Sequence, residues 1–368
     1  MATRRRDRRP ARPVIAAAVL VLLALVAGCG GGASGDGGSS GAAPTSAEVQ
    51  EVLARLGDSA IAPAYGRLGT SLDDLAASVD ALCTTPSDAA LDAARSAWRE
   101  AIGSWQATRA GGVGPAMEAR LMSDVAFAAR APSVEDLVAG DDPVTLDAVA
   151  ERGAAVRGLY ALEVALFGEG SEALATAEGA RRCTYASSLA TLAAQAAAPV
   201  VAAWVGGDAV GELAAGLDGG PTSSVSQLVN EVSFRLTELD QRTLHDLAAA
   251  DSYEDLPADR AEGPAAHGIA DRRALLAGVV AVLGDADRGL VALVAETDPD
   301  LADRLVAAAE RATATVGELD DSMALAFDDR EAVAEASDAV AELQVLVATE
   351  LAAELGVTIS FSDADGDS

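Results

Sequence analysis

Ser71–Cys83, with the sequence SLDDLAASVDALC, contains the pattern that decides the class of the fold. Its large apolar residues recur at steps of three and four, at Leu72, Leu75, Val79 and Leu82. Steps of this length place the side chains along one face of a helix, whereas a half-buried strand alternates at every second residue. The segment is therefore predicted to form an amphipathic helix that packs by this face.

The helical period continues from about residue 47 onward. Pro63 is expected to interrupt the first helix, and Ser87 is expected to cap the start of the next one. Half of the residues are hydrophobic but only 3% are aromatic, so the core has to consist of alanine, leucine and valine. Such a core suits packed helices, and no alternating run is long enough for a sheet. The predicted fold class is all-α.

Glycine-rich stretches divide the predicted helices into two helical-bundle domains. A polar, glycine-rich segment at 206–221 separates an N-terminal domain at 47–205 from a C-terminal domain at 206–368. In the first domain, one helix is expected to run from Pro143 to Phe167. The second domain contains four helical stretches, at about 222–250, 268–296, 299–327 and 330–355. Short connections between the last three predict an antiparallel four-helix bundle.

The start of the chain has the pattern of a lipoprotein signal peptide. An arginine-rich start precedes an apolar run from Val14 to Ala27, which is short for a membrane-spanning helix. The run ends in Val26-Ala27-Gly28-Cys29, which resembles the bacterial lipobox, where small residues precede a lipidated cysteine. An ordinary signal peptide followed by a chance cysteine is the alternative.

We therefore predict a signal peptide at 1–28, lipidation of Cys29 and a Gly/Ser-rich tether at 29–46. Two or more acyl chains would make the membrane a stable partner. The lipobox resemblance implies an extracytoplasmic location in the cell envelope. In a diderm organism, Gly30 after the cysteine favours the outer membrane, with the protein facing the periplasm.

Charge excludes several classes of function. The chain has 57 acidic and 26 basic residues, a formal charge of −31, and every base is an arginine. Removal of residues 1–28 takes away six arginines and one aspartate, so the charge becomes −36. Such a chain repels phosphate backbones, which excludes unaided nucleic-acid binding. The two histidines, His245 and His267, are too few and too far apart for a multi-histidine zinc site.

Two cysteines, Cys83 and Cys183, remain once Cys29 is lipidated. An even pair in an oxidising compartment favours a disulfide, which would close a loop of roughly 100 residues. Two buried free thiols are the alternative.

Arg157–Gly168, with the sequence RGLYALEVALFG, is the most informative segment for function. Its leucines at 159, 162 and 166 form one helical stripe, and Tyr160 and Glu163 share the adjacent face. Taken alone, the segment reads as a core helix with a solvated glutamate.

Together with other ordered blocks, this segment resembles the imelysin family. Its members include proposed metallopeptidases and iron-uptake-associated lipoproteins of the envelope. The other blocks are Leu82–Pro86, Ala94–Trp98 with Trp105, Gly114–Pro115, Ser123–Phe127, Arg181–Tyr185 and Leu355–Asp367. The resemblance extends across nearly the whole mature chain.

The family's metal signature is Gly-x-His-x-x-Glu, and this chain departs from it at one position. Gly158 and Glu163 match, whereas Tyr160 stands where the signature has histidine. A phenol titrates near pH 10 and is a poor zinc ligand, unlike a neutral imidazole. This departure argues against a zinc peptidase, and no catalytic residue is assigned.

Carboxylates and phenolates can still hold a hard cation such as iron(III). The candidate metal or ligand-binding residues are Glu163, Tyr160 and Asp124, with Gly158 and Arg157 as support from the motif. A divalent metal or iron is accordingly the candidate cofactor. Alternatively, Arg157 or Arg99 neutralises Glu163 in a structural ion pair.

The sequence thus predicts a lipid-anchored envelope protein with a binding or accessory role in iron or other metal uptake. Its expected partners are the membrane, a metal ion or an envelope protein. A zinc metallopeptidase of the imelysin type and a non-catalytic protein-interaction module are the alternatives. Convergence of Glu163 and Tyr160 with other donors between the domains would favour the two metal-dependent hypotheses.

Overall fold

The computed structural model describes residues 44–217, 221–257 and 260–360, which belong to a compact unit spanning Ser40–Ser368. The predicted signal peptide, Cys29 and most of the predicted tether lie outside the described residues, as does Phe361–Asp367.

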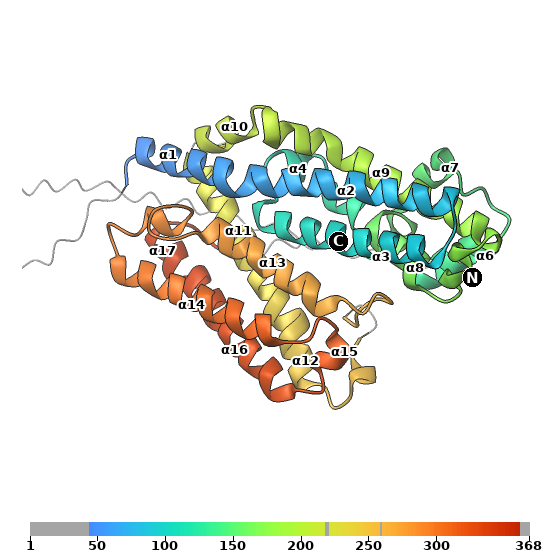
Figure 1. The fold of residues 1–368 in the computed structure, drawn as a ribbon. Coiled ribbons are helices and arrows are strands. Elements are labelled where there is room, and N and C mark those ends of the chain that lie inside the picture. Colours follow the sequence, from blue (N-terminus) through green and yellow to red (C-terminus); the bar gives the residue numbers. More distant parts are fainter. Residues whose placement is uncertain (1–43, 218–220, 258–259, 361–368) are drawn as a thin grey trace, which may run out of the picture. The chain divides into compact units, whose positions relative to one another are not determined.

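The all-α class is confirmed, because the described residues form helices and a single isolated bridge, with no strand. The α-helices are α1 (Ser46–Leu56), α2 (Ala62–Thr84), α3 (Asp88–Thr108), α4 (Pro115–Glu118), α5 (Leu121–Val125), α6 (Ala131–Ala139), α7 (Leu146–Ala150), α8 (Gly158–Phe167), α9 (Ala180–Gly206), α10 (Ala209–Ala215), α11 (Pro221–Leu239), α12 (His245–Ala249), α13 (Gly268–Leu283), α14 (Pro299–Glu318), α15 (Met323–Ala326), α16 (Arg330–Val345) and α17 (Ala352–Glu354) (Figure 1).

Helices α2, α3, α8 and α9 pack into a ring, which we call the first ring. Helix α2 contacts α3 and α9, and α8 contacts the same two helices. The predicted apolar stripe of α2 is buried in this ring, at Leu72, Leu75, Val79 and Leu82. The predicted disulfide is confirmed, since Cys83 at the end of α2 is bonded to Cys183 in the first turn of α9, with their Cα atoms 5.5 Å apart. Ser87 caps α3 as expected, accepting a hydrogen bond from the Ala90 N–H.

A second ring is formed by α11, α13, α14 and α16. Helix α11 contacts α13 and α16, and α14 contacts the same two helices. Helix α13 also packs against α3 of the first ring. The division into two separate domains at residue 206 stays a prediction.

Proline produces the expected irregularity near the N-terminus. Helices α1 and α2 are joined by a π-helical turn at Gly57–Ile61, and Pro63 is the second residue of α2. Proline lacks the N–H that an uninterrupted α-helix would use as a donor. The π-turn absorbs the missing hydrogen bond, and the helical path continues from α1 into α2. A second π-turn, at Asp240–Leu244, joins α11 to α12, and no proline lies in or next to it.

The predicted helix from Pro143 to Phe167 is wrong in its middle. The chain forms α7, leaves the helix at Glu151 and restarts as α8 at Gly158. Arg157 is extended and Gly158 has a φ of 77°, which no right-handed helix contains. The predicted helix at 268–296 likewise ends early, at Leu283, because Gly284 and Gly289 both adopt positive φ in a tight turn.

Helix α9 lies inside a segment, Ala177–Gly206, that is long and apolar enough to cross a membrane. The helix nevertheless carries Arg181 and Arg182 in its first turn, is bonded to α2 through Cys183, and packs along both α2 and α8. We interpret it as a core helix of the fold.

Candidate functional site

Two close contacts fix the start of α8, the helix that carries the signature segment. A Cβ atom on Gly158 would lie 2.6 Å from the backbone oxygen of Val125, so only glycine fits between α8 and the end of α5. The indole N–H of Trp98 donates to the backbone oxygen of Leu159 at 2.8 Å, which joins α8 to α3. These contacts determine which way Tyr160 and Glu163 point.

Tyr160 is tied into a chain of polar side chains. The amide of Gln106 donates to the Tyr160 hydroxyl at 3.0 Å and accepts from Arg109 at 2.9 Å. Arg109 then pairs with Glu238 of α11, with an Nη2–Oε2 distance of 2.8 Å. Burial raises the pKa of Tyr160 to about 12, and the nearby charge of Asp271 acts in the same direction. The phenol is therefore neutral at physiological pH.

Glu163 is buried, with only 6% of its surface exposed. Its Oε1 accepts a hydrogen bond from the backbone N–H of Ala265, in the segment before α13, at 3.0 Å. Burial raises the pKa of Glu163 to about 7, the Ala265 N–H opposes this rise, and the charges of Asp271 and Glu262 add to it. The solvated glutamate that the isolated segment suggested is thus a buried one.

Asp271 completes this group of buried carboxylates, and the sequence interpretation missed it. It is 5% exposed, and its Oδ1 has no hydrogen-bond partner among the described residues. Burial raises its pKa to about 7, while Arg272 and Arg109 act against the rise. A signal existed in the sequence, because Asp271 shares one stripe with the buried residues Leu275, Gly278 and Val282. An acid on an apolar stripe is the exception that marks a candidate site.

Asp124 and the two arginines considered as partners of Glu163 have other contacts. Arg157 pairs with Asp124 at 3.2 Å. The guanidinium of Arg99 lies over the ring of Phe167, 4.9 Å from its centre. The structure therefore brings Tyr160 and Glu163 close to the charge of Asp271, and gives Asp124 a separate ion pair.

The sequence of this chain matches the family model of imelysin, also named peptidase M75, over residues 61–350. The chain belongs to the imelysin family. No match was found among curated protein sequences.

Two solved structures share the fold of this imelysin-family chain. An imelysin-like protein from Psychrobacter arcticum 273-4 has a TM-score of 0.68 and 21% identity, covering 86% of this chain and 98% of its own. A protein from Parabacteroides distasonis ATCC 8503, described as an iron-regulated protein A precursor, has a TM-score of 0.74 and 17% identity, covering 86% of this chain and 97% of its own. At these identities the likeness shows the fold alone.

The donors present do not fit the resident metal that the family signature implies. Within the part of the chain that the structure describes, no three His, Cys, Asp or Glu side chains are grouped to hold a metal ion. The Tyr160 hydroxyl already accepts from Gln106 and stays protonated, while Glu163 accepts from Ala265. A neutral phenol and an engaged carboxylate are weak substitutes for imidazole and a free carboxylate.

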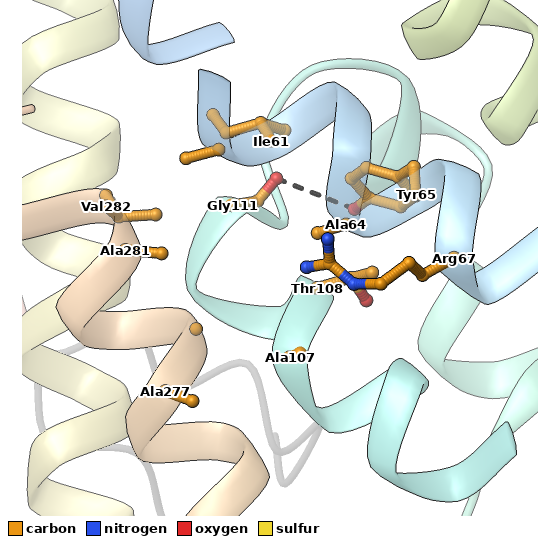
Figure 2. Close-up of a pocket in the computed structure, with 12 residues that line it drawn as sticks. Ile61, Ala64, Tyr65, Arg67, Ala107, Thr108, Gly111, Ala277, Ala281 and Val282 are labelled. Atoms are coloured by element: carbon orange, nitrogen blue, oxygen red, sulfur yellow. Dashed lines mark hydrogen bonds between the residues drawn. The ribbon is translucent and has the colours of Figure 1, made fainter. Parts of the chain in front are cut away.

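A small cavity lies where the π-turn before α2, the first turns of α2, the end of α3 and α13 meet. Its volume is about 70 Å³, and its walls are mostly apolar. Figure 2 shows the Tyr65 hydroxyl beside it, directed at the backbone oxygen of Gly111, 3.5 Å away. The cavity has room for water-sized molecules and offers few polar groups, so we place the candidate site at Tyr160, Glu163 and Asp271 instead.

Asp271→Asn is expected to raise the free energy of unfolding by about 3–4 kcal/mol at pH 8. An aspartate ionises near 3.8 in the unfolded chain but near 7 in this protein, so the folded state loses stability as the pH rises between these values. The gain should therefore disappear near pH 4. Urea denaturation at both pH values measures it, with the exposed Asp303→Asn as control. An equal gain at both pH values would show that packing, and not buried charge, is responsible.

Proposed function

We propose that this imelysin-family chain is a lipid-anchored envelope protein with a binding or accessory role in the uptake of iron or another metal. Family membership and the fold shared with a protein described as iron-regulated support this role. The acidic composition, with 57 acids against 26 bases, suits a protein that works near cations.

The observation that separates this proposal from the metallopeptidase alternative is the state of Tyr160 and Glu163. A zinc peptidase needs donors that hold the metal and leave one position open for water. Here the tyrosine that replaces the signature histidine is neutral and bonded to Gln106, and Glu163 is covered by Ala265. This arrangement argues against peptide hydrolysis, so the binding or accessory role rests on family membership and the shared fold.

The anchor and the partners belong to the same proposal. Lipidation of Cys29 would hold the body at a membrane of the cell envelope, which in a diderm organism is the outer membrane facing the periplasm. A metal ion as cargo or an envelope protein is the proposed partner, and the strong negative charge argues against nucleic acid.

Deletion of the gene is expected to lower the initial rate of radioactive iron uptake by iron-starved cells. The full-length protein should restore the rate, and the Cys29→Ser variant, which cannot be lipidated, should restore it incompletely. If uptake is the same with and without the protein, the proposed role in iron uptake is wrong, and the interaction-module hypothesis takes its place.

The purified full-length protein in detergent should not cleave a mixed peptide library, with or without added zinc. Cleavage that requires zinc and disappears in Glu163→Ala would instead establish the metallopeptidase alternative. An unrelated lipoprotein purified in the same detergent controls for contaminating proteases.

A further inference from the structure

Residues Glu262–His267, which we call the strap, lead directly into α13 and lie over the signature glutamate. The Ala265 N–H donates to Glu163 Oε1 at 3.0 Å. Gly263 is so close that a Cβ atom there would lie 2.2 Å from the same oxygen. The strap thus covers the buried carboxylate that α8 presents.

The strap is held by more hydrogen bonds at Glu262 than at Ala265. Glu262 accepts hydrogen bonds from the backbone N–H groups of Gly268, Met323 and Ala324, and from the hydroxyl of Ser322, at 2.6–3.1 Å. These partners lie at the start of α13, which directly follows the strap, and at the start of α15. By contrast, Ala265 is joined to α8 by one hydrogen bond among the described residues. His267, at the other end of the strap, also packs edge-on against Trp98 of α3, with ring centres 6.5 Å apart. The attachment of Ala265 to α8 therefore has fewer hydrogen bonds than the attachment of Glu262.

The closed strap is itself a costly arrangement. Ala266 has a φ of 50°, a left-handed conformation that residues with a Cβ rarely adopt. Below the strap, Glu163 and Asp271 are both more than nine-tenths buried, and Asp271 Oδ1 has no partner among the described residues. Buried carboxylates gain hydration when water reaches them, so opening of the strap recovers part of this cost.

We propose that the strap is a lid, anchored at Glu262, that opens by breaking the hydrogen bond between Ala265 and Glu163 and lets solvent reach Glu163 and Asp271. The opening rests on the contacts described above and not on the proposed role in uptake.

Hydrogen exchange of the full-length protein in detergent tests the lid directly. The Ala265 amide is expected to exchange at least about 100-fold faster than amides in the centre of α13, because local opening does not require unfolding. Glu163→Ala removes its acceptor and should speed exchange of the Ala265 amide by roughly tenfold more, while leaving α13 unchanged. If the Ala265 amide exchanges as slowly as the centre of α13 in the wild type, the lid is wrong.

Gly263→Ala provides a second variant that keeps every charge. The added methyl group must displace either the strap or the Glu163 carboxylate, and both movements break the Ala265 hydrogen bond. Exchange in the strap should therefore accelerate, whereas Gly317→Ala, which has no heavy atom within 4 Å of its added Cβ, should leave it unchanged. Equal exchange in the two variants would also overturn the lid. Since iron uptake by cells is measured separately, failure of the lid and failure of the uptake role are distinguishable.

Discussion

Gly158→Ala is expected to lower the free energy of unfolding by about 3–5 kcal/mol. Gly158 has a φ of 77°, a conformation that alanine adopts only with strain. The added Cβ would also lie 2.6 Å from the backbone oxygen and 2.9 Å from the backbone carbon of Val125. A backbone group cannot rotate away as a side chain does, so α8 must separate from α5 to relieve the contact.

Urea denaturation followed by circular dichroism measures this loss, and Gly317→Ala is the matched control. Gly317 lies exposed in the last turns of α14, where an alanine Cβ meets no neighbour. Alanine is there expected to be neutral or to stabilise by up to about 1 kcal/mol. A Gly158→Ala protein within 1 kcal/mol (roughly the spread of ordinary surface substitutions) of the wild type would refute the account of the signature glycine.

Features that depend on near neighbours in the chain were predictable from the sequence. The apolar stripe from Leu72 to Leu82, the cap at Ser87 and the break before Pro63 each follow from a few adjacent residues. The Cys83–Cys183 disulfide followed from counting cysteines in an oxidising compartment.

Features that depend on contacts between distant segments were not predictable in this way. The contact of Ala265 with Glu163 joins residues 102 positions apart, and no local pattern encodes it. Helix α8 begins at Gly158 because the backbone of Val125 lies against this residue. The helical period of 143–167 does not reveal this contact. Asp271 was detectable in principle, but an acid followed by Arg272 and Arg273 resembles a solvated turn until α13 is placed against α3.

The buried groups divide into one set that stabilises the fold and one that destabilises it. Arg109 and Glu238 are oppositely charged, and the two guanidinium Nη atoms donate to the two carboxylate oxygens at 3.0 and 2.8 Å. Burial raises the pKa of both Glu163 and Asp271, and the charge of Asp271 raises the pKa of Glu163 further. The buried carboxylates Glu163 and Asp271 lower the stability of the fold when they ionise. Buried groups that lower stability are the pattern expected of a functional site.

Arg109→Met is expected to lower the free energy of unfolding by about 3–5 kcal/mol at pH 7, because it leaves Glu238 buried without its main partner. Burial by itself would raise the pKa of Glu238, but the guanidinium groups of Arg109 and Arg235 hold it at about 2. The ordinary value is 4.5, so ionised Glu238 adds about 3 kcal/mol above pH 4.5, and this contribution is lost as the pH falls towards 2.

The loss in Arg109→Met should therefore shrink as the pH falls below 4.5, since protonated Glu238 no longer needs the arginine. The double variant Arg109→Met with Glu238→Gln should recover a large part of the loss at pH 7, because it removes the unpaired charge. Arg55→Met breaks the exposed pair with Glu51 and should change stability little. If Arg109→Met costs no more than Arg55→Met, the Arg109–Glu238 pair does not hold α3 to α11, and the polar chain that ends at Tyr160 has no structural anchor in the second ring.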